Sequence, residues 1–119
     1  MGGRAAFLAN AILPLVCAVS YYGGGIAERL LSRAGDQHGP LLLFWGGKDT
    51  HVGPKQHYAV ADALRQAGKR FTDVEFSDAS HGFFCDARQS YDPAAAGESW
   101  ALLKTFFETS LRPGSPASL

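Results

Sequence analysis

The chain has 119 residues, of which 46% are hydrophobic and 18% are charged, as in an ordinary globular domain. This length fits one domain or part of one and excludes two independent domains. Eleven basic and eleven acidic residues cancel, so no basic surface is available for a phosphate backbone and we expect no nucleic-acid partner. Two cysteines, Cys17 and Cys85, are too few for a disulfide framework, and we expect a cytoplasmic protein.

The first part of the chain holds an apolar run, residues 5–19, that superficially resembles a secretion signal. Asn10 and Pro14 interrupt this run, and a helix over residues 3–9, a turn and a strand over residues 15–21 account for the same residues. No apolar stretch reaches the ~18 residues that a membrane span requires, so we expect no membrane association.

Two further segments have the character of strands. Residues 41–45 are apolar without interruption, which is typical of a parallel strand covered on both faces. Residues 71–76 alternate between apolar and polar, which favours a position at the edge of the sheet.

Two longer segments have apolar residues at helical spacing. The first covers residues 54–67 and ends before Gly68, and the second covers residues 94–111 after Asp92 and Pro93, an N-cap and a first-turn residue. The predicted inward-facing side chains are Tyr58, Ala61, Leu64 and Ala67 in the first helix, and Trp100, Leu103, Phe106, Phe107 and Leu111 in the second.

The alternation of these elements, with a short helix after the first strand, predicts an α/β fold. We expect a parallel sheet of about three strands with flanking helices and right-handed crossovers. Residues 1–111 are expected to form this fold, whereas residues 112–119, rich in Pro, Gly and Ser, are predicted to form a flexible tail.

A carboxylate and an imidazole follow two of the predicted strands. Asp49 comes after the second strand and His81 after the third, so parallel strands would bring both to the same edge of the sheet. There the aspartate would orient the histidine, as in a hydrolase triad. The alternative is that Asp49 caps the helix near Pro54 and that His81 merely lies in a turn.

The remaining histidines and glycines do not form a known site. His38, His51 and His57 lack the spacing of metal ligands, and we expect no metal. Residues 46–49 lack the spacing of a phosphate-binding loop, and residues 23–25 lack a dinucleotide fingerprint, so we expect no cofactor.

Five short segments, taken in order, resemble one known family. They are Met1-Gly2-Gly3-Arg4-Ala5, Tyr21-Tyr22-Gly23, Phe44-Trp45-Gly46-Gly47-Lys48-Asp49, His81-Gly82-Phe83 and Tyr91-Asp92-Pro93-Ala94-Ala95-Ala96. The pattern is similar to the C-terminal half of the dienelactone hydrolases (carboxymethylenebutenolidases) of the α/β-hydrolase superfamily, from residue 1 to about residue 111. The resemblance implies a three-layer α/β-hydrolase-like fold and hydrolysis of a small ester or lactone.

The resemblance also implies roles for individual residues. Asp49 corresponds to the acid and His81 to the base of a Cys-His-Asp triad, and Tyr22 and Phe83 would flank the substrate cleft. The family nucleophile is the cysteine of a Gly-x-Cys-x-Gly-Gly elbow, whose last three positions match the segment that starts at Met1. We therefore expect the nucleophilic cysteine to lie upstream of this chain and the chain alone to be inactive. If the chain continues upstream, the amide of Met1 is expected to form part of the oxyanion hole.

The two cysteines of the chain do not replace this nucleophile. Cys17 is expected to pack inside a strand. Cys85 is expected to border the pocket, but it follows His81 in the sequence and does not lie in a nucleophile elbow. Loss of the preceding strand would leave residues 15–21 as an apolar free edge, so we expect a homo-oligomer or pairing with a complementary N-terminal half.

Two other interpretations compete with the hydrolase. A non-catalytic α/β module that acts by oligomerisation or partner binding would need no nucleophile. A flavodoxin-like binding domain would explain the alternation of strands and helices, but not the sequence contexts of Asp49 and His81.

Overall fold

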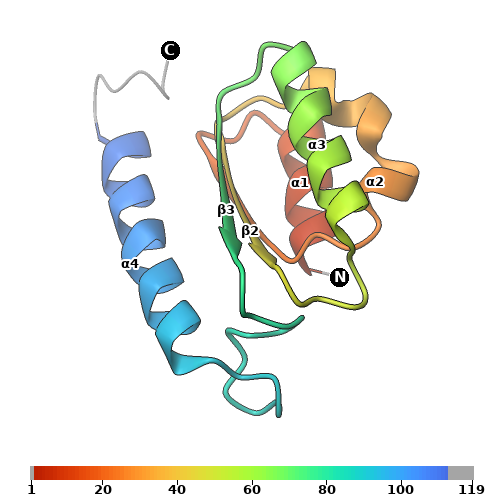
Figure 1. Cartoon of the computed structure of the whole chain (residues 1–119). Helices are drawn as coiled ribbons and strands as arrows, with labels where there is room; N and C mark the ends of the chain where they lie inside the picture. The colour runs from red at the N-terminus through yellow and green to blue at the C-terminus, as the bar shows by residue number, and fades with distance from the viewer. Residues whose placement is uncertain (1, 113–119) are drawn as a thin grey trace.

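The computed structural model describes residues 2–112, so the expected role of Met1 and the predicted tail beyond Arg112 lie outside the described residues. The elements are α1 (Gly2–Ile12), β1 (Ala18–Tyr21), α2 (Ile26–Arg29), the short 3-10 helix η1 (Leu31–Asp36), β2 (Leu41–Gly46), α3 (Pro54–Gln66), β3 (Phe71–Phe76) and α4 (Pro93–Ser110), as Figure 1 shows.

The three strands form one parallel sheet in the order β1-β2-β3, which confirms the predicted α/β class. In the central strand β2 all six residues are buried, as expected for a strand covered on both faces. The edge strand β3 is exposed at Thr72, Asp73 and Glu75, in keeping with its predicted position.

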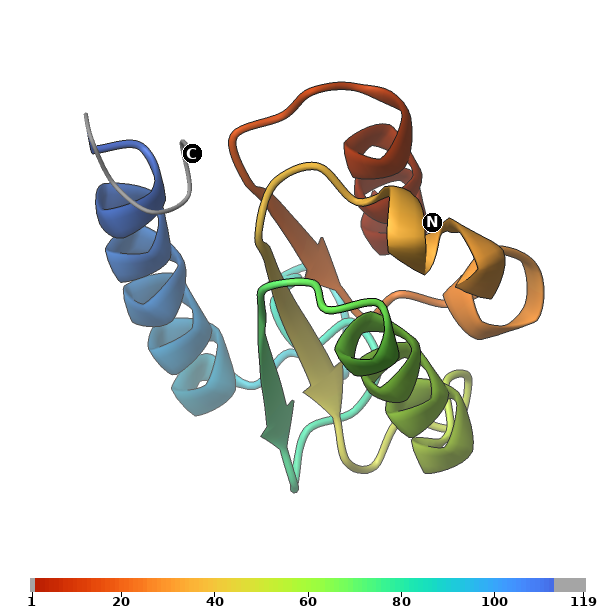
Figure 2. The same ribbon diagram turned by 90° about the horizontal axis from the view of Figure 1, so that it is seen from above.

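Helices cover both faces of the sheet, so the chain has three layers (Figures 1 and 2). Helices α1, α2 and α3 lie on one face, where Leu41, Leu43 and Trp45 of β2 join the larger core cluster. Helix α4 covers the other face, where Leu42 and Phe44 join the second cluster. The alternation of β2 side chains thus divides its apolar run between two cores.

The predicted bounds of the first helix and strand need correction. Helix α1 continues to Ile12 rather than ending at residue 9, and β1 begins at Ala18 rather than at residue 15. The side chain of Asn10 donates to Gln37 and to the carbonyl of Gly39 and accepts from the Gly39 amide, all at 2.7–3.0 Å. Because these bonds occupy the side chain, it does not compete with the helix backbone, and the helix passes through Asn10.

The predicted inward face of α3 is only partly correct. Ala61 and Leu64 are buried, but Tyr58 is 52% exposed and Ala67 is also exposed. The buried positions include His57, whose imidazole reaches carboxylates on β3. The polar contacts of His57 therefore fix the rotation of the helix together with its apolar residues. Gly68 has a φ of 70° and follows the helix end, as its sequence position predicts.

Helix α4 begins as predicted, because the Asp92 side chain accepts hydrogen bonds from the amides of Ala94 and Ala95. Its predicted stripe is wrong at Trp100 and Leu111, which are 50% and 59% exposed. In the first turns the helix instead buries the small residues Ala95, Ala96 and Ser99. Further along, Leu103 and Phe106 pack against the second core cluster.

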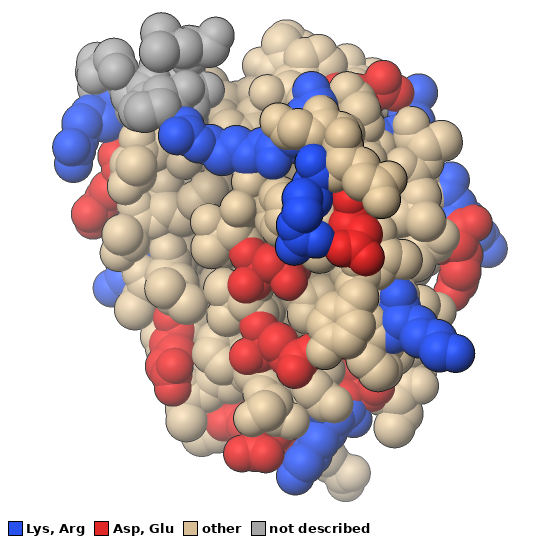
Figure 3. Space-filling model, turned by 45° about the horizontal axis from the view of Figure 1, so that its top comes forward, with Lys and Arg blue, Asp and Glu red and all other residues tan. Residues whose placement is uncertain are grey.

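Acidic and basic side chains are interspersed over the face shown in Figure 3, with no large area of one sign. This mixture agrees with the zero net charge of the sequence. Within residues 2–112, no helix is both long and apolar enough to span a membrane.

Candidate active site

Two loops meet at the carboxyl ends of β2 and β3. The amide of Gly47 donates to the Phe76 carbonyl at 2.8 Å, and the amide of Lys48 donates to the Ala79 carbonyl at 2.9 Å. A Cβ on Gly46 would lie 2.5 Å from the Ala79 oxygen, so this close approach requires glycine. The sequence Gly46-Gly47 therefore allows the loop that carries Asp49 to lie directly against the loop that carries His81.

The structure brings Asp49 and His81 together, as the parallel arrangement predicts. His81 Nδ1 lies 2.7 Å from Asp49 Oδ2. The other carboxylate oxygen, Oδ1, accepts from the amides of His51 at 2.7 Å and Val52 at 2.9 Å. The N-cap of α3 is Gly53, so Asp49 does not cap that helix, although it does hold the turn before it. One buried carboxylate thus fixes the loop and binds the imidazole.

This hydrogen bond determines which nitrogen of His81 is free to act. An ionised carboxylate only accepts, so Nδ1 carries the proton, and in the neutral ring Nε2 keeps its lone pair. The Asp49 side chain is only 2% exposed, whereas that of His81 is 22% exposed. The pair therefore has the character of a buried orienting acid and an accessible base.

His81 lines a hollow of about 400 Å³ at this edge of the sheet. The hollow also contains Gly2 and Gly3 from the amino end of α1, Tyr22 from the end of β1, and Arg88 from the loop before α4. Three separate segments, namely the start of α1, the end of β1 and the loop after β3, thus meet in one cavity at the edge where open α/β sheets bind ligands.

Tyr22, expected beside the cleft, lies in this hollow against His81. The two ring centroids are 5.0 Å apart, and the Tyr22 hydroxyl accepts a hydrogen bond of 3.2 Å from the Phe84 amide. Tyr22 is also the one non-glycine among residues 2–112 with positive φ, at 44°. Such strained backbone is concentrated at functional sites. Burial raises the pKa of Tyr22, so its hydroxyl stays neutral at physiological pH.

Phe83, also expected beside the cleft, does not line the hollow. It is fully buried, and its ring packs against Tyr22 and Phe76 with centroid distances of 5.1 and 5.4 Å. Gly82 has a φ of 80°, which turns the chain so that Phe83 enters the core beneath α4. Phe83 therefore supports Tyr22 from behind.

The two thiols lie in different surroundings. Cys17 is half-buried just before β1, where burial raises its pKa, and it is not inside the strand as expected. Cys85 is exposed and lines the hollow beside His81, as expected.

Sequence reasoning missed two further residues at the site. The Arg88 side chain lies across Gly82, since a Cβ on Gly82 would be 2.8 Å from Arg88 Cδ. The ring of His51 contacts that of His81 edge-on, with centroids 5.1 Å apart. Neither belongs to a motif, and only the loop conformations bring them to the site. Within residues 2–112, no three metal-binding side chains converge.

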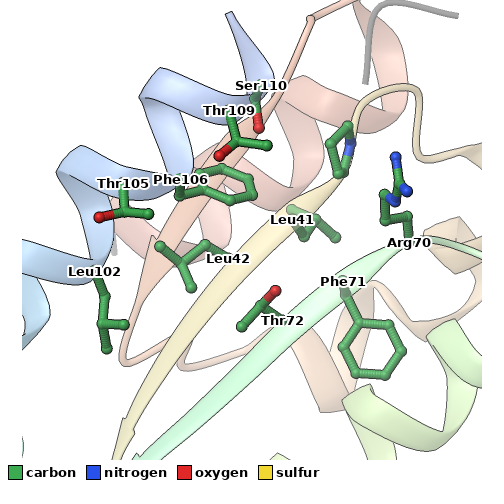
Figure 4. A pocket seen from close by; sticks show the side chains of 11 residues that line it. Leu41, Leu42, Arg70, Phe71, Thr72, Leu102, Thr105, Phe106, Thr109 and Ser110 are labelled. Carbon is green, nitrogen blue, oxygen red and sulfur yellow. The ribbon is translucent and has the colours of Figure 1, made fainter. Parts of the chain in front are cut away.

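A second cavity, of about 440 Å³, lies at the opposite end of the sheet (Figure 4). Leu42 and Thr72 form part of its floor and Phe106 of α4 covers it, while Arg70 stands at one side. Although its walls are more apolar, it opens at the amino ends of β2 and β3. It is therefore separate from Asp49 and His81, and we assign the chemistry to the hollow at the carboxyl ends.

The chain is similar to several known proteins over most of its length. A protein of Synechocystis sp. provisionally named carboxymethylenebutenolidase is 30% identical over 118 residues, which are 93% of this chain and 48% of that protein. A protein of Salmonella typhimurium with the same provisional name is 32% identical over 114 residues, covering 89% of this chain and 42% of its own length. The chain thus spans about half the length of the curated relatives that it matches.

Solved structures show the same fold. The crystal structure of a protein from Klebsiella pneumoniae, provisionally named a dienelactone hydrolase, superposes with a TM-score of 0.84 at 29% identity, over 89% of this chain and 48% of that one. The three-stranded sheet and its helices therefore belong to an α/β-hydrolase fold. The model of the dienelactone hydrolase family matches residues 1–111, and the chain is a member of that family.

Proposed function

We propose that this chain supplies the acid and the base of a Cys-His-Asp hydrolase that cleaves a small ester or lactone. The observation that carries the proposal is the hydrogen bond from His81 to the buried Asp49, beside a hollow shared with the amino end of α1. Family membership adds the reaction type. In this proposal Asp49 orients His81, and Tyr22 forms one wall of the substrate site.

The nucleophile in this proposal is a cysteine immediately before Met1 in a longer protein. His81 Nε2 takes the thiol proton, and the thiolate attacks the carbonyl carbon. The ester C–O bond then breaks, and the leaving alkoxide receives the proton from His81. In the second half-reaction His81 takes a proton from water, which attacks the thioester and releases a carboxylic acid and the thiol.

The position of α1 supports this placement of the nucleophile. Gly2 and Gly3 line the same hollow as His81, so a residue just before them would be near the imidazole. The helix begins in close contact with β1. A Cβ on Gly3 would lie only 2.3 Å from the Tyr21 backbone oxygen, so this approach requires glycine. In the same scheme the Met1 amide donates to the oxyanion, and the 119-residue chain alone does not hydrolyse esters. The free state of Cys17 and Cys85 fits the cytoplasm.

The decisive test is the DNA sequence upstream of the Met1 codon, followed by an esterase assay of the extended protein. We expect an in-frame Gly-x-Cys immediately before Met1 and thiol-dependent hydrolysis of a small aryl ester. Asp49→Asn and His81→Gln should each lower kcat by about 10² to 10⁴. His38→Gln is the matched control at an exposed histidine outside the hollow. An in-frame stop codon beside a ribosome-binding site before Met1 would contradict the proposal.

One observation favours a second candidate, binding through the open edge of β1. The amides of Ala18 and Tyr22 donate to Pro40 and Phe44, so the intervening residues Val19 and Tyr21 direct their backbone groups away from β2. No other strand within residues 2–112 pairs with that side. This edge suits a complementary N-terminal half or a second copy of the chain.

Sedimentation of the purified chain tests this candidate. We expect a dimer or larger species at tens of micromolar concentration, and we expect Val19→Pro to dissociate it by removing an outward amide. Tyr58→Ser, which alters an exposed apolar residue on α3, is the control. A monodisperse wild-type monomer would contradict binding through β1.

A further inference from the structure

The ring of His81 stands between two hollows. One is the cavity that it shares with Tyr22 and the amino end of α1. The other, of about 470 Å³, is lined by polar residues that include Lys48, His51 and Ser80. His81 and Arg88 belong to both, whereas Tyr22 belongs only to the first and His51 only to the second.

Tyr22 and His51 thus contact His81 from different sides. The Tyr22 ring lies 5.0 Å from the His81 ring at an interplanar angle of 48°. The His51 ring lies 5.1 Å away at 70°, an edge-to-face arrangement. The bond from Nδ1 to Asp49 fixes one point of the imidazole but leaves rotation about that bond to be restrained by neighbouring groups.

His51 is itself held by the carboxylate that binds His81. Its amide donates to Asp49 Oδ1 at 2.7 Å, while Asp49 Oδ2 accepts from His81. The backbone of His51 is therefore fixed relative to the His81 ring, although its side chain is exposed. An exposed side chain on a fixed backbone can cover its neighbour without being part of the core.

We propose that His51 is a positioning residue for His81. Its ring covers the imidazole on the side away from α1, so that the Nδ1–H stays hydrogen-bonded to Asp49 and Nε2 stays directed toward the nucleophile side. The inference rests on the proposed function for its catalytic meaning, but the contact itself can be measured in this chain without substrate.

The test measures, by NMR at constant pH, the rate at which the His81 Nδ1 proton exchanges with water. Four proteins are compared: the wild type and three single variants. Compared with wild type, His51→Ala should speed the exchange about two- to tenfold, the range that one edge-to-face contact contributes to an equilibrium. His51→Phe keeps a ring and should restore slow exchange. Thr50→Ala alters the same loop and the same hollow without removing a ring, and should leave the exchange unchanged.

The amide signals of residues 51 and 52 show whether Asp49 still holds the turn in each variant. Fast exchange in His51→Ala with these signals in place, and rescue by phenylalanine, would support the proposal. Unchanged exchange in His51→Ala, equally fast exchange in His51→Phe, or fast exchange in Thr50→Ala would each overturn it.

The same variants in an extended, active protein separate this inference from the proposed function. There His51→Ala should lower kcat with little change in KM, and His51→Phe should recover it. Failure of the extended protein to hydrolyse any ester would contradict the proposed function, whereas the proton-exchange result would stand independently.

Discussion

Replacing Asp73 with alanine should destabilise the fold more than its position on an exposed edge strand suggests. Asp73 Oδ1 accepts from Trp45 Nε1 at 2.7 Å, and Oδ2 lies 2.5 Å from His57 Nε2. Trp45 is 3% and His57 is 4% exposed, and the two rings stack with centroids 4.6 Å apart. Asp73 thus holds two buried donors from β2 and α3.

The expected magnitude follows from the donors that Asp73→Ala would leave without an acceptor. Each buried unsatisfied donor costs about 1–3 kcal/mol. Two such donors suggest a loss of about 2–6 kcal/mol. The 23% exposure of the Asp73 side chain, which admits some water, favours the lower half of that range. Glu75 makes a single bond of 3.2 Å to His57 and is more exposed, so Glu75→Ala should cost below about 1.5 kcal/mol.

Urea unfolding followed by circular dichroism gives the free energies, and tryptophan fluorescence reports the site. Trp45 is buried and Trp100 is 50% exposed, so a Trp100→Phe background isolates the signal of Trp45. Asp62→Ala, which breaks an exposed ion pair with Arg65, is the control and should change stability by less than about 1 kcal/mol. If Asp73→Ala and Asp62→Ala had equal effects, the reasoning from buried donors would be refuted.

Three other predictions concern packing, pH and thiol reactivity. Gly3→Ala should destabilise the chain by more than about 1 kcal/mol in urea unfolding, since its Cβ would lie 2.3 Å from a backbone oxygen of β1, whereas Gly2→Ala has open space and should be neutral or stabilising. Burial raises the pKa of Tyr22, so the contribution of the neutral Tyr22 side chain to stability is complete below pH ~10 and is lost as pH rises through the folded-state pKa. Tyr22→Phe should therefore flatten the dependence of the melting temperature on pH in that range. Iodoacetamide should modify the exposed Cys85 faster than Cys17, whose pKa is raised by burial, and mass spectrometry after Cys85→Ser should show only slow labelling.

The sequence was sufficient to predict the sheet and the contact between Asp49 and His81, because both depend on short-range patterns. The uninterrupted apolar run of β2 and the alternation of β3 predict a central and an edge strand. Parallel strands then place the residues that follow them at one edge, which is why Asp49 and His81 could be paired before their contact was known.

The rest could not be predicted because it depends on contacts between distant segments. The inward position of His57 depends on carboxylates of β3, and periodicity alone favoured Tyr58 in its place. The burial of Phe83 depends on the left-handed turn at Gly82, which sequence spacing does not show. The contact between His51 and His81 requires the turn that Asp49 holds.

The division of the site between elements has a consequence for how the proposed enzyme would assemble. Asp49 and His81 meet through the pairing of β2 with β3, and both strands lie within this chain. The contact that orients His81 therefore lies within this chain. The proposed nucleophile depends on the seating of α1 against β1, where Gly3 permits close contact. Gly3→Ala should for this reason disturb the hollow at the α1 side while leaving the hydrogen bond between Asp49 and His81 intact, and the two effects can be separated by following the His81 ring signals alongside stability.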